Sequence, residues 1–164
     1  MLACLIVGAA FTVVTVGIHS VGTAWWIGCL KCKQHSIPTG LAARLLPIKL
    51  LCSTALVLLV LHLAEAFPWA LLYMNLPSDD AINTFEEAIY FATVTFASLG
   101  YGDVVLSGPW RALSAIQAMN GLLVFGWSTA LLFAVVQRIW GDESENQLKP
   151  SESEHSLQTI RQFG

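Results

Sequence analysis

Charged residues are scarce in this sequence. Asp, Glu, Lys and Arg make up 12% of the 164 residues, hydrophobic residues make up 55%, and the mean hydropathy is +0.65. A soluble domain of this length carries about a quarter charged residues, so the composition favours a membrane protein. The formal net charge is only −3. Because no basic patch is present, we expect no nucleic-acid partner.

Cysteines and early basic residues are also few. Cys4, Cys29, Cys32 and Cys52 do not fall in segments that resemble extramembrane loops, so we expect no disulfide framework. No Lys or Arg precedes the first apolar run, which is longer than the core of a signal peptide. We interpret it as a retained span. It lacks the arginine ladder of a voltage sensor, so strong voltage gating from this span is not expected.

Three long apolar segments predict three transmembrane helices, over residues 2–30, 45–76 and 109–140. Between the second and the third, Thr84 and Glu87 have the spacing of a capping box. The helix that they start, over residues 85–96, is too short to span a membrane. It ends at glycine-rich chain, so we infer a re-entrant loop with a pore helix, of a kind tolerated only when buried in protein or lining a wet cavity.

The predicted fold is therefore an all-α membrane protein with three transmembrane helices plus a re-entrant pore helix. Four segments follow along the chain: a first transmembrane helix (1–30), a cytoplasmic loop (31–44), a pore domain (45–140) and a cytoplasmic tail (141–164). The tail is polar and poor in aromatic residues, so we expect it to be disordered apart from one short helix.

The basic residues predict the orientation in the membrane. All but Arg111 lie in the first loop or after the last span: Lys31, Lys33, Arg44, Lys49, Arg138, Lys149 and Arg161. The positive-inside rule then places the first loop and the tail in the cytoplasm and the N-terminus outside. The re-entrant loop enters from outside. We expect a multi-pass protein of the plasma membrane, most simply a bacterial inner membrane.

The segment after the short helix carries the most specific motif: Ser98, Leu99, Gly100, Tyr101, Gly102 and Asp103. It resembles the selectivity filter of the potassium-channel family, usually written Thr-Val-Gly-Tyr-Gly-Asp. Consecutive carbonyls point the same way only where the backbone alternates in hand, and Gly100 and Gly102 adopt the left-handed form at low cost. The resemblance implies that the backbone carbonyls of Ser98, Leu99, Gly100 and Tyr101, together with the Ser98 hydroxyl, replace the hydration shell of potassium.

The resemblance also implies roles for residues around the filter. Tyr90 would hydrogen-bond Asp103 behind the filter, and Thr95 matches the threonine of the family's pore helix. Gly121 and Gly126 serve either gating by bending or close helix packing. The residues expected to line the cavity are Leu122, Phe125 and Thr129. One chain carries one filter strand, so the ring requires a homotetramer.

Two departures from the family's motif leave the selectivity open. Ser98 replaces the usual Thr and loses the methyl group that stiffens its rotamer, and Leu99 replaces the usual Val. The main prediction is a passive potassium-selective channel subunit, with potassium at the filter and no other cofactor. The alternative is a weakly selective cation channel of the same fold.

Two further groups of residues lie outside the filter. His62 and Glu65 share one face of the second span, and ionisable groups there are usually paired. We predict a structural hydrogen bond, to the last span or to His19, over a proton-sensing role. Cys29 and Cys32 have redox spacing with His35 nearby, which leaves a membrane thiol oxidoreductase as the second alternative. No thioredoxin-like pattern surrounds them, so we expect no enzymatic activity.

Overall fold

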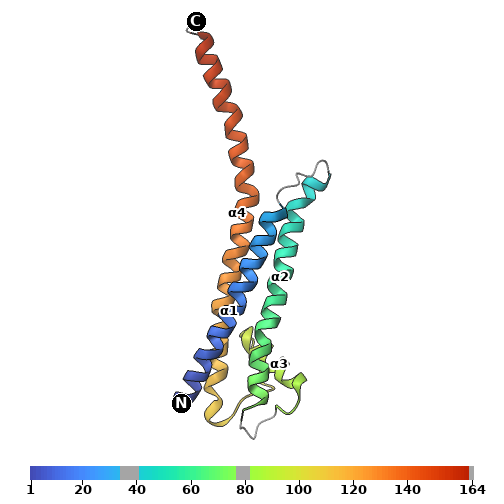
Figure 1. Ribbon diagram of the computed structural model, residues 1–164, viewed down its shortest axis with the longest axis vertical. Helices are drawn as coiled ribbons and strands as arrows, with labels where there is room; N and C mark the ends of the chain where they lie inside the picture. Colours follow the sequence, from blue (N-terminus) through green and yellow to red (C-terminus); the bar gives the residue numbers. More distant parts are fainter. Residues whose placement is uncertain (34–40, 77–81, 163–164) are drawn as a thin grey trace.

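The computed structural model describes residues 1–33, 41–76 and 82–162, and in this part of the chain all regular structure is helical. The helices are α1 (Leu2–Lys33), α2 (Leu41–Met74), α3 (Phe85–Phe96) and α4 (Ala112–Gln162), with a 3-10 turn, η1 (Gly108–Trp110), before α4 (Figure 1). The all-α prediction is confirmed. The expected turn at Pro38 and the acidic residues Asp79 and Asp80 lie outside the described residues.

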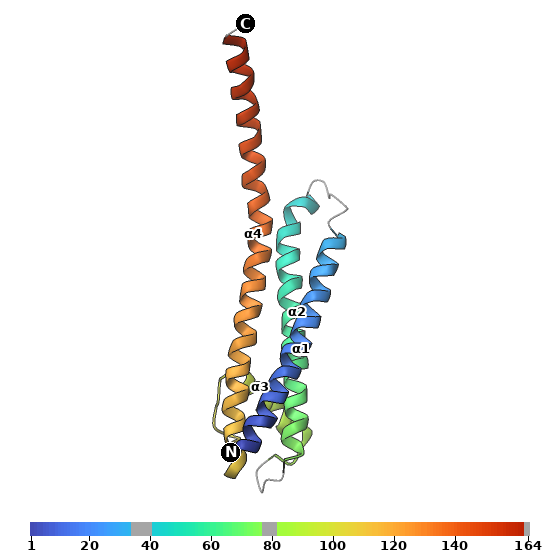
Figure 2. The same cartoon turned by 60° about the vertical axis from the view of Figure 1, so that its left-hand side comes forward.

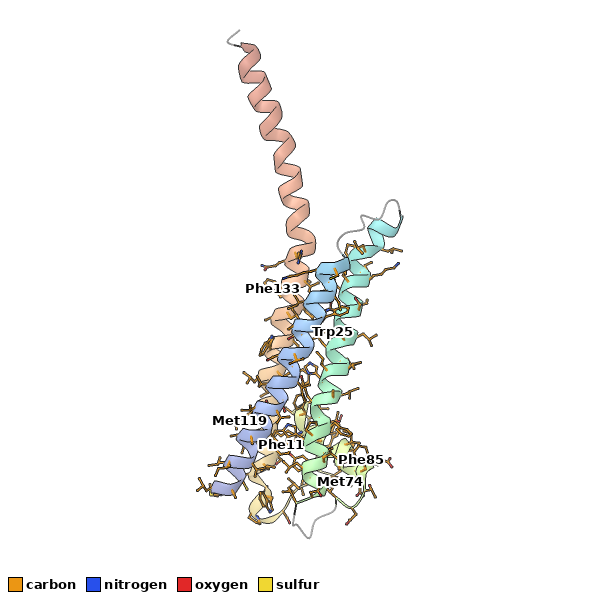
Figure 3. All side chains as sticks on the ribbon, viewed as in Figure 1. Phe11, Trp25, Met74, Phe85, Met119 and Phe133 are labelled. Atoms are coloured by element: carbon orange, nitrogen blue, oxygen red, sulfur yellow. The ribbon has the colours of Figure 1, made fainter. Side chains whose placement is uncertain are left out.

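Three helical segments are long and apolar enough to cross a membrane: Leu2–Cys32, Leu45–Met74 and Gly108–Arg138. They correspond to the three predicted spans. The long helices run side by side in alternating directions, and α3 lies at the end of the bundle that holds the N-terminus (Figures 1 and 2). Trp25, Met119 and Phe133 are about 60% exposed and project from the bundle (Figure 3).

The chain beyond the last span differs from the prediction. α4 does not end near residue 140 but continues to Gln162, and its C-terminal part projects past the other helices (Figure 2). The expected tail with one short helix is therefore wrong for residues 141–162. Extension of an existing helix needs no new nucleus. The four Glu and three Gln residues between 141 and 162 have good helix propensity, whereas Pro150 opposes the helix that it interrupts.

The hydrophobic core lies where α2, α3 and α4 meet. Trp69 and Tyr73 of α2 are fully buried there, together with Phe91 and Leu113. Two hydrogen bonds cross this core: the Tyr73 hydroxyl donates to Gln117 Oε1 at 2.7 Å, and Gln117 Nε2 donates to the carbonyl of Ala92 at 3.0 Å. These contacts hold the end of α3, and therefore the chain that follows it, against α4.

Buried tryptophan side chains join α1 to α2. Trp69 Nε1 donates to Thr15 Oγ1 at 3.0 Å, and Trp26 Nε1 donates to Thr54 Oγ1 at 3.1 Å. Trp25 is 63% exposed, as a membrane-interface residue would be, whereas Trp26 is 8% exposed. The neighbouring positions Trp25 and Trp26, at the end of the first apolar run, would both suit the membrane interface by sequence, but Trp26 does not lie there, because its indole N–H has a partner inside the bundle.

Candidate ion-conducting site

The site begins at the N-terminus of α3, where the predicted capping box is present. Glu87 N donates to Thr84 Oγ1 at 3.2 Å, and Glu87 Oε2 accepts from the backbone N–H groups of Asn83 and Thr84 at 2.9 and 3.1 Å. Hydrogen bonds from the Asn83 and Thr84 backbone lower the pKa of Glu87. The first turn of α3 is thus fixed while its apolar face packs on α2.

The chain leaves α3 in a conformation that brings residues 98–102 back along the helix. Ser98 N donates to the carbonyl of Thr95 at 2.9 Å, and Leu99 N donates to the carbonyl of Val94 at 3.0 Å. The φ angles of Ser98, Gly100 and Gly102 are +57°, +53° and +80°, whereas Leu99 and Tyr101 have no positive φ. The backbone therefore alternates in hand residue by residue, in the pattern that can turn successive carbonyls to one side.

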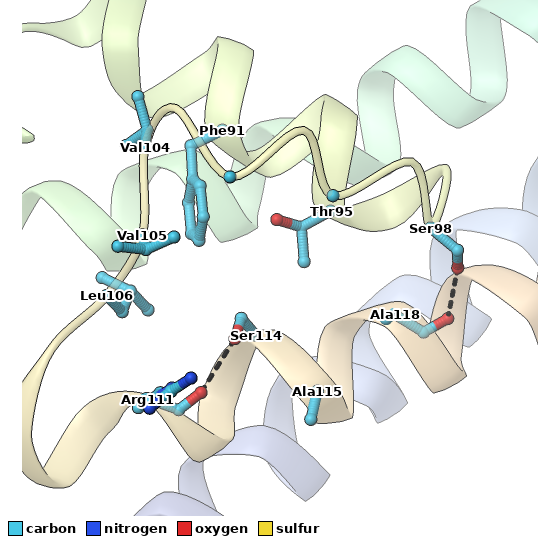
Figure 4. A pocket seen from close by; sticks show the side chains of 12 residues that line it. Phe91, Thr95, Ser98, Val104, Val105, Leu106, Arg111, Ser114, Ala115 and Ala118 are labelled. Atoms are coloured by element: carbon cyan, nitrogen blue, oxygen red, sulfur yellow. Dashed lines mark hydrogen bonds between the residues drawn. The ribbon is translucent and has the colours of Figure 1, made fainter.

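The positive φ of Ser98 was not expected from the sequence. Among residues with a side chain, the left-handed region is uncommon, and it costs free energy that glycine does not lose. The Ser98 hydroxyl lies 3.4 Å from the carbonyl of Ala118 on α4, a long contact that fixes its direction only weakly (Figure 4). No sequence signal distinguishes this serine, because its conformation is imposed by the chain on both sides.

Behind the extended segment, Tyr90 of α3 donates a hydrogen bond to Asp103 Oδ2 at 2.6 Å. The expected bond is therefore present. Asp103 Oδ1 also accepts from the Val104 N–H at 3.0 Å. The bond with Tyr90 lowers the pKa of Asp103, and the same bond raises the pKa of Tyr90. It connects the far end of the extended segment to the middle of α3.

A pocket of about 340 Å³ lies between this segment and the first turns of α4. Thr95 and Phe91 reach it from α3, and the opposite wall is formed by Arg111, just before α4, and by Ser114 and Ala118 of α4 (Figure 4). Gly100 and Gly102 lie at its border. Thr95, predicted as a filter support, is 8% exposed and lines the pocket on its α3 side.

The two glycines of α4 differ in their surroundings. A Cβ on Gly121 would lie 1.9 Å from the carbonyl oxygen of Phe96, the last residue of α3, whereas a Cβ on Gly126 would meet nothing within 4 Å. Of the two roles considered for Gly121, close packing is the one with a contact in the structure. It lets α4 touch the backbone at the end of α3, next to Ser98.

The other residues predicted to line a cavity do not share one environment. Leu122 is 62% exposed, and Thr129 is exposed with its hydroxyl bonded to the Phe125 carbonyl at 2.9 Å. Phe125 is half-buried, with its ring 4.4 Å from the ring of His62 and 5.7 Å from that of Phe96. Phe125 therefore packs partly inside the single chain.

The predicted polar residues inside the bundle meet in one cluster. His19 Nδ1 lies 2.8 Å from Glu65 Oε1, and His62 Nδ1 lies 3.1 Å from Glu65 Oε2. On its other side, His62 Nε2 lies 3.1 Å from Ser128 Oγ of α4. Both bonding partners that were considered for this face are present, and Ser128, which sequence reasoning missed, completes the link. Cys29 and Cys32 are free thiols in α1.

These features define a class: a multi-pass helical membrane protein in which a capped short helix and a left-right alternating segment lie between two spans. Comparison with known proteins agrees. The ion channel family matches residues 55–138, just over half of the chain, and the chain therefore belongs to the ion channel family. The match covers most of α2, all of α3, the segment 98–103 and α4 as far as Arg138. Comparisons with curated proteins and with solved structures gave no match.

Proposed function

We propose that this ion channel protein is a subunit of a passive potassium-selective channel, and that residues 98–102 form one strand of its selectivity filter. The observation that carries the proposal is the alternation of backbone hand from Ser98 to Gly102. A potassium ion entering a pore loses its hydration shell, and a ring of carbonyls on one side of each strand replaces it. The bond between Tyr90 and Asp103 and the packing of Gly121 on Phe96 would hold each strand in place.

The proposed assembly is a homotetramer around a fourfold axis. One chain supplies one strand, and a closed ring of ligands needs several. The exposed side chains of Leu99, Tyr101, Leu122 and Leu123 support this proposal, because large apolar side chains on one chain are typical of a surface that an assembly or lipid covers. In this arrangement α3 and residues 98–103 form a re-entrant loop that enters the membrane from the extracellular side, and the C-terminus lies in the cytoplasm.

The electrostatics support a cation as the permeant species. The C-terminal end of α3 carries the negative end of the helix dipole, and it lies directly before Ser98. Glu86 and Glu87 lie in the first turn of α3, and Asp103 follows the proposed filter strand. Carboxylates at this end of the strand would raise the local concentration of cations. The lowered pKa values of Glu87 and Asp103 keep those two groups ionised at neutral pH.

A weakly selective cation channel of the same fold is the second candidate. It is favoured by Ser98, because the contact between the Ser98 hydroxyl and the Ala118 carbonyl is 3.4 Å long and holds the hydroxyl only weakly. A loosely held ligand discriminates less well between potassium and sodium than a fixed one does.

Flux through purified protein in liposomes tests the proposal. We expect barium-sensitive potassium uptake that is abolished by Gly100→Ala, since a Cβ at a φ of +53° is strained. Gly17→Ala is the matched control, because nothing lies within 4 Å of the added Cβ and Gly17 belongs to α1, outside the proposed filter and cavity. Reversal potentials in potassium against sodium then separate the two candidates. Equal permeabilities would reject the selective channel, and absence of any cation flux would reject both.

A further inference from the structure

We propose that His19, His62 and Glu65 form a binding site for a divalent transition-metal ion of the zinc type, inside the helical bundle and apart from residues 98–102. Each residue offers one ligand atom, and these atoms all lie within 4.8 Å of one another. The ligands come from α1 and α2. The site does not depend on the proposed potassium selectivity.

The distances suit a small tetrahedral ion. Zinc binds imidazole nitrogen and carboxylate oxygen at about 2.0–2.2 Å, which places neighbouring ligand atoms on the order of 3.3 Å apart. Two separations in the cluster are close to this value, one at each oxygen of the Glu65 carboxyl group: 2.8 Å between His19 Nδ1 and Glu65 Oε1, and 3.1 Å between His62 Nδ1 and Glu65 Oε2. One ligand atom from each of the three residues lies within 4.8 Å of the others. Rotation of the side chains toward a common centre would bring the three ligands onto one ion.

The donor set selects the class of metal. Two imidazoles and one carboxylate match zinc and its first-row neighbours, and a His₂Glu set leaves a fourth position for water. Calcium needs six or more oxygen ligands, and magnesium keeps an octahedral oxygen shell. Three ligands, two of them nitrogen, do not suit either ion.

The cluster is shielded from solvent. The side chains of His19 and Glu65 are 0% exposed, and that of His62 is 11% exposed. The nearest Lys or Arg along these helices is Arg138, ten residues after Ser128 and therefore about 15 Å along the axis. Two imidazoles and a carboxyl group that converge inside the bundle can therefore act together as ligands of one metal cation.

Partners for the outer sides of the imidazoles are partly in place. When Nδ1 binds a metal, the proton of a neutral histidine sits on Nε2, and metal-bound histidines usually donate this N–H to a neighbour. His62 Nε2 faces Ser128 Oγ at 3.1 Å. His19 Nε2 is buried with no hydrogen-bond partner in the part of the chain that the structure describes. The His19 and Trp127 rings pack in a T-shaped arrangement, with their centroids 5.3 Å apart.

The site gives α1 a specific role. Residues 55–138 match the ion channel family, so α1 lies outside the match. One ion would tie His19 of α1 to His62 and Glu65 of α2. Through His62 it would also reach Ser128 and Phe125 of α4. The metal would therefore join all three spans at mid-membrane depth.

Metal binding to the full-length protein in detergent tests the proposal. Cys29, Cys32 and Cys52 are first changed to Ser, which removes the accessible thiol ligands. The protein is stripped with a chelator and titrated with Zn²⁺ against a chromophoric chelator at neutral pH. We expect one tight zinc ion per chain. Glu65→Gln and His19→Asn, which keep similar size and hydrogen bonding, are each expected to weaken binding at least tenfold, whereas His35→Gln, the matched control, leaves it unchanged.

Cobalt provides a second measurement on an unaltered cluster. In the cysteine-depleted protein, Co²⁺ bound to two imidazoles and a carboxylate is expected to show visible d–d absorption without a sulfur-to-cobalt charge-transfer band. Zn²⁺ should displace this spectrum. Absence of both zinc binding and the cobalt spectrum would show that the residues form a hydrogen-bonded cluster only. Undiminished zinc affinity in a folded Glu65→Gln protein would equally overturn the proposal.

Discussion

At the scale of single residues, Gly100 and Gly121 lie twenty-one positions apart in the chain, and each position requires glycine for a different physical reason. Gly100 adopts a φ of +53°, which any side chain would strain. Gly121 has an ordinary helical backbone, and its lack of a Cβ matters because the Phe96 carbonyl occupies the space. Conformation explains the first and close approach explains the second.

The contact at Gly121 predicts a large effect of a single methyl group. In Gly121→Ala the new Cβ would overlap the Phe96 backbone, which cannot rotate away as a side chain can, and overpacking of this kind costs about 1–3 kcal/mol or more. We expect a lower melting temperature of the detergent-solubilised protein. Gly126→Ala should be neutral or slightly stabilising, because alanine is the better helix former. Equal melting temperatures for the two variants would contradict the packing role.

The bond between Tyr90 and Asp103 predicts a pH window. The Asp103 carboxylate has a lowered pKa. Its contribution to the stability of the folded protein is therefore complete above the ordinary Asp pKa of about 4, and disappears as the pH falls through the lower pKa of the folded state. The hydroxyl has a raised pKa, so its contribution is present below the ordinary Tyr pKa of about 10 and is lost as the pH rises through the higher folded value. The bond is therefore intact across neutral pH.

Removal of the hydroxyl tests this window. In Tyr90→Phe, Asp103 loses the bond that lowers its pKa, so the acid-induced loss of conductance should move upward, toward pH 4. Currents recorded while the external pH is lowered stepwise measure the shift. Thr93→Val is the matched control, since it also removes a hydroxyl group from α3, but one that bonds the Ile89 carbonyl of its own helix. An unchanged acid limit in Tyr90→Phe would contradict the proposed coupling.

At the scale of helices, α3 depends on its cap and α1 depends on its buried partners. α3 has only twelve residues, a length at which an isolated helix is marginal. α1 is held to α2 through buried donors and acceptors, among them the Trp69 indole and the Thr15 hydroxyl. Each element can therefore be weakened by loss of one polar atom.

The capping box predicts a difference between two adjacent glutamates. Glu87→Ala removes the oxygen that accepts from the backbone N–H groups of Asn83 and Thr84, so it should weaken the start of α3; loss of a capping side chain typically costs about 1 kcal/mol. Glu86→Ala removes the same charge without touching the cap. Thermal unfolding should show a lower melting temperature for Glu87→Ala than for Glu86→Ala. Similar melting temperatures would argue against the cap.

Thr15 offers the matching test for α1. In Thr15→Ala the Trp69 N–H loses its partner inside the bundle, and an unsatisfied buried donor costs about 1–3 kcal/mol. Thr12→Ala is the control, because the Thr12 hydroxyl bonds a carbonyl of its own helix. Chemical denaturation in mild detergent measures both variants. A Thr12→Ala protein as unstable as Thr15→Ala would contradict the importance of this contact between helices.

At the scale of the whole molecule, α1 and the C-terminal part of α4 extend outside the family match. Their contacts with the rest of the chain differ. α1 contributes His19 and Thr15 to buried contacts with α2, and Cys4 to a contact with the Pro109 carbonyl of η1. The segment of α4 after Arg138 projects beyond the other helices (Figure 2). The two ends should therefore tolerate deletion differently.

Truncation measures this difference. We expect a chain ending at residue 141 to keep the oligomeric state and the cation flux of the full-length protein, because the contacts between helices that are given above all involve residues before position 139. A chain lacking residues 1–33 should lose both, since Glu65 and Trp69 would be left without their α1 partners. Size-exclusion chromatography with light scattering, and liposome flux, report on each. Loss of assembly in the chain ending at residue 141 would assign the projecting helix a role in it.

The sequence by itself determined the features that depend on local chemistry and hydrophobic length. The apolar runs predicted the three spans, the Thr84 and Glu87 spacing predicted the cap of α3, and the Gly-Tyr-Gly motif located the candidate filter strand. Each of these signals is contained in one continuous stretch of the chain, so no knowledge of the fold is needed to interpret it. The continuation of α4 through residues 141–162 was not predicted, because the loss of apolar character marks where a span ends but not where its helix ends.

Only the tertiary structure decided the features that join residues far apart in the chain. It packed Gly121 on Phe96, turned Trp26 inward to Thr54, gave Ser98 a positive φ, and brought Ser128 to the cluster of His19, His62 and Glu65. Which faces of three apolar helices meet depends on side-chain packing summed over the whole bundle. A span that is apolar on all sides carries little periodic signal to reveal its inner face, so the partner of each buried polar atom became known only once the helices were in place.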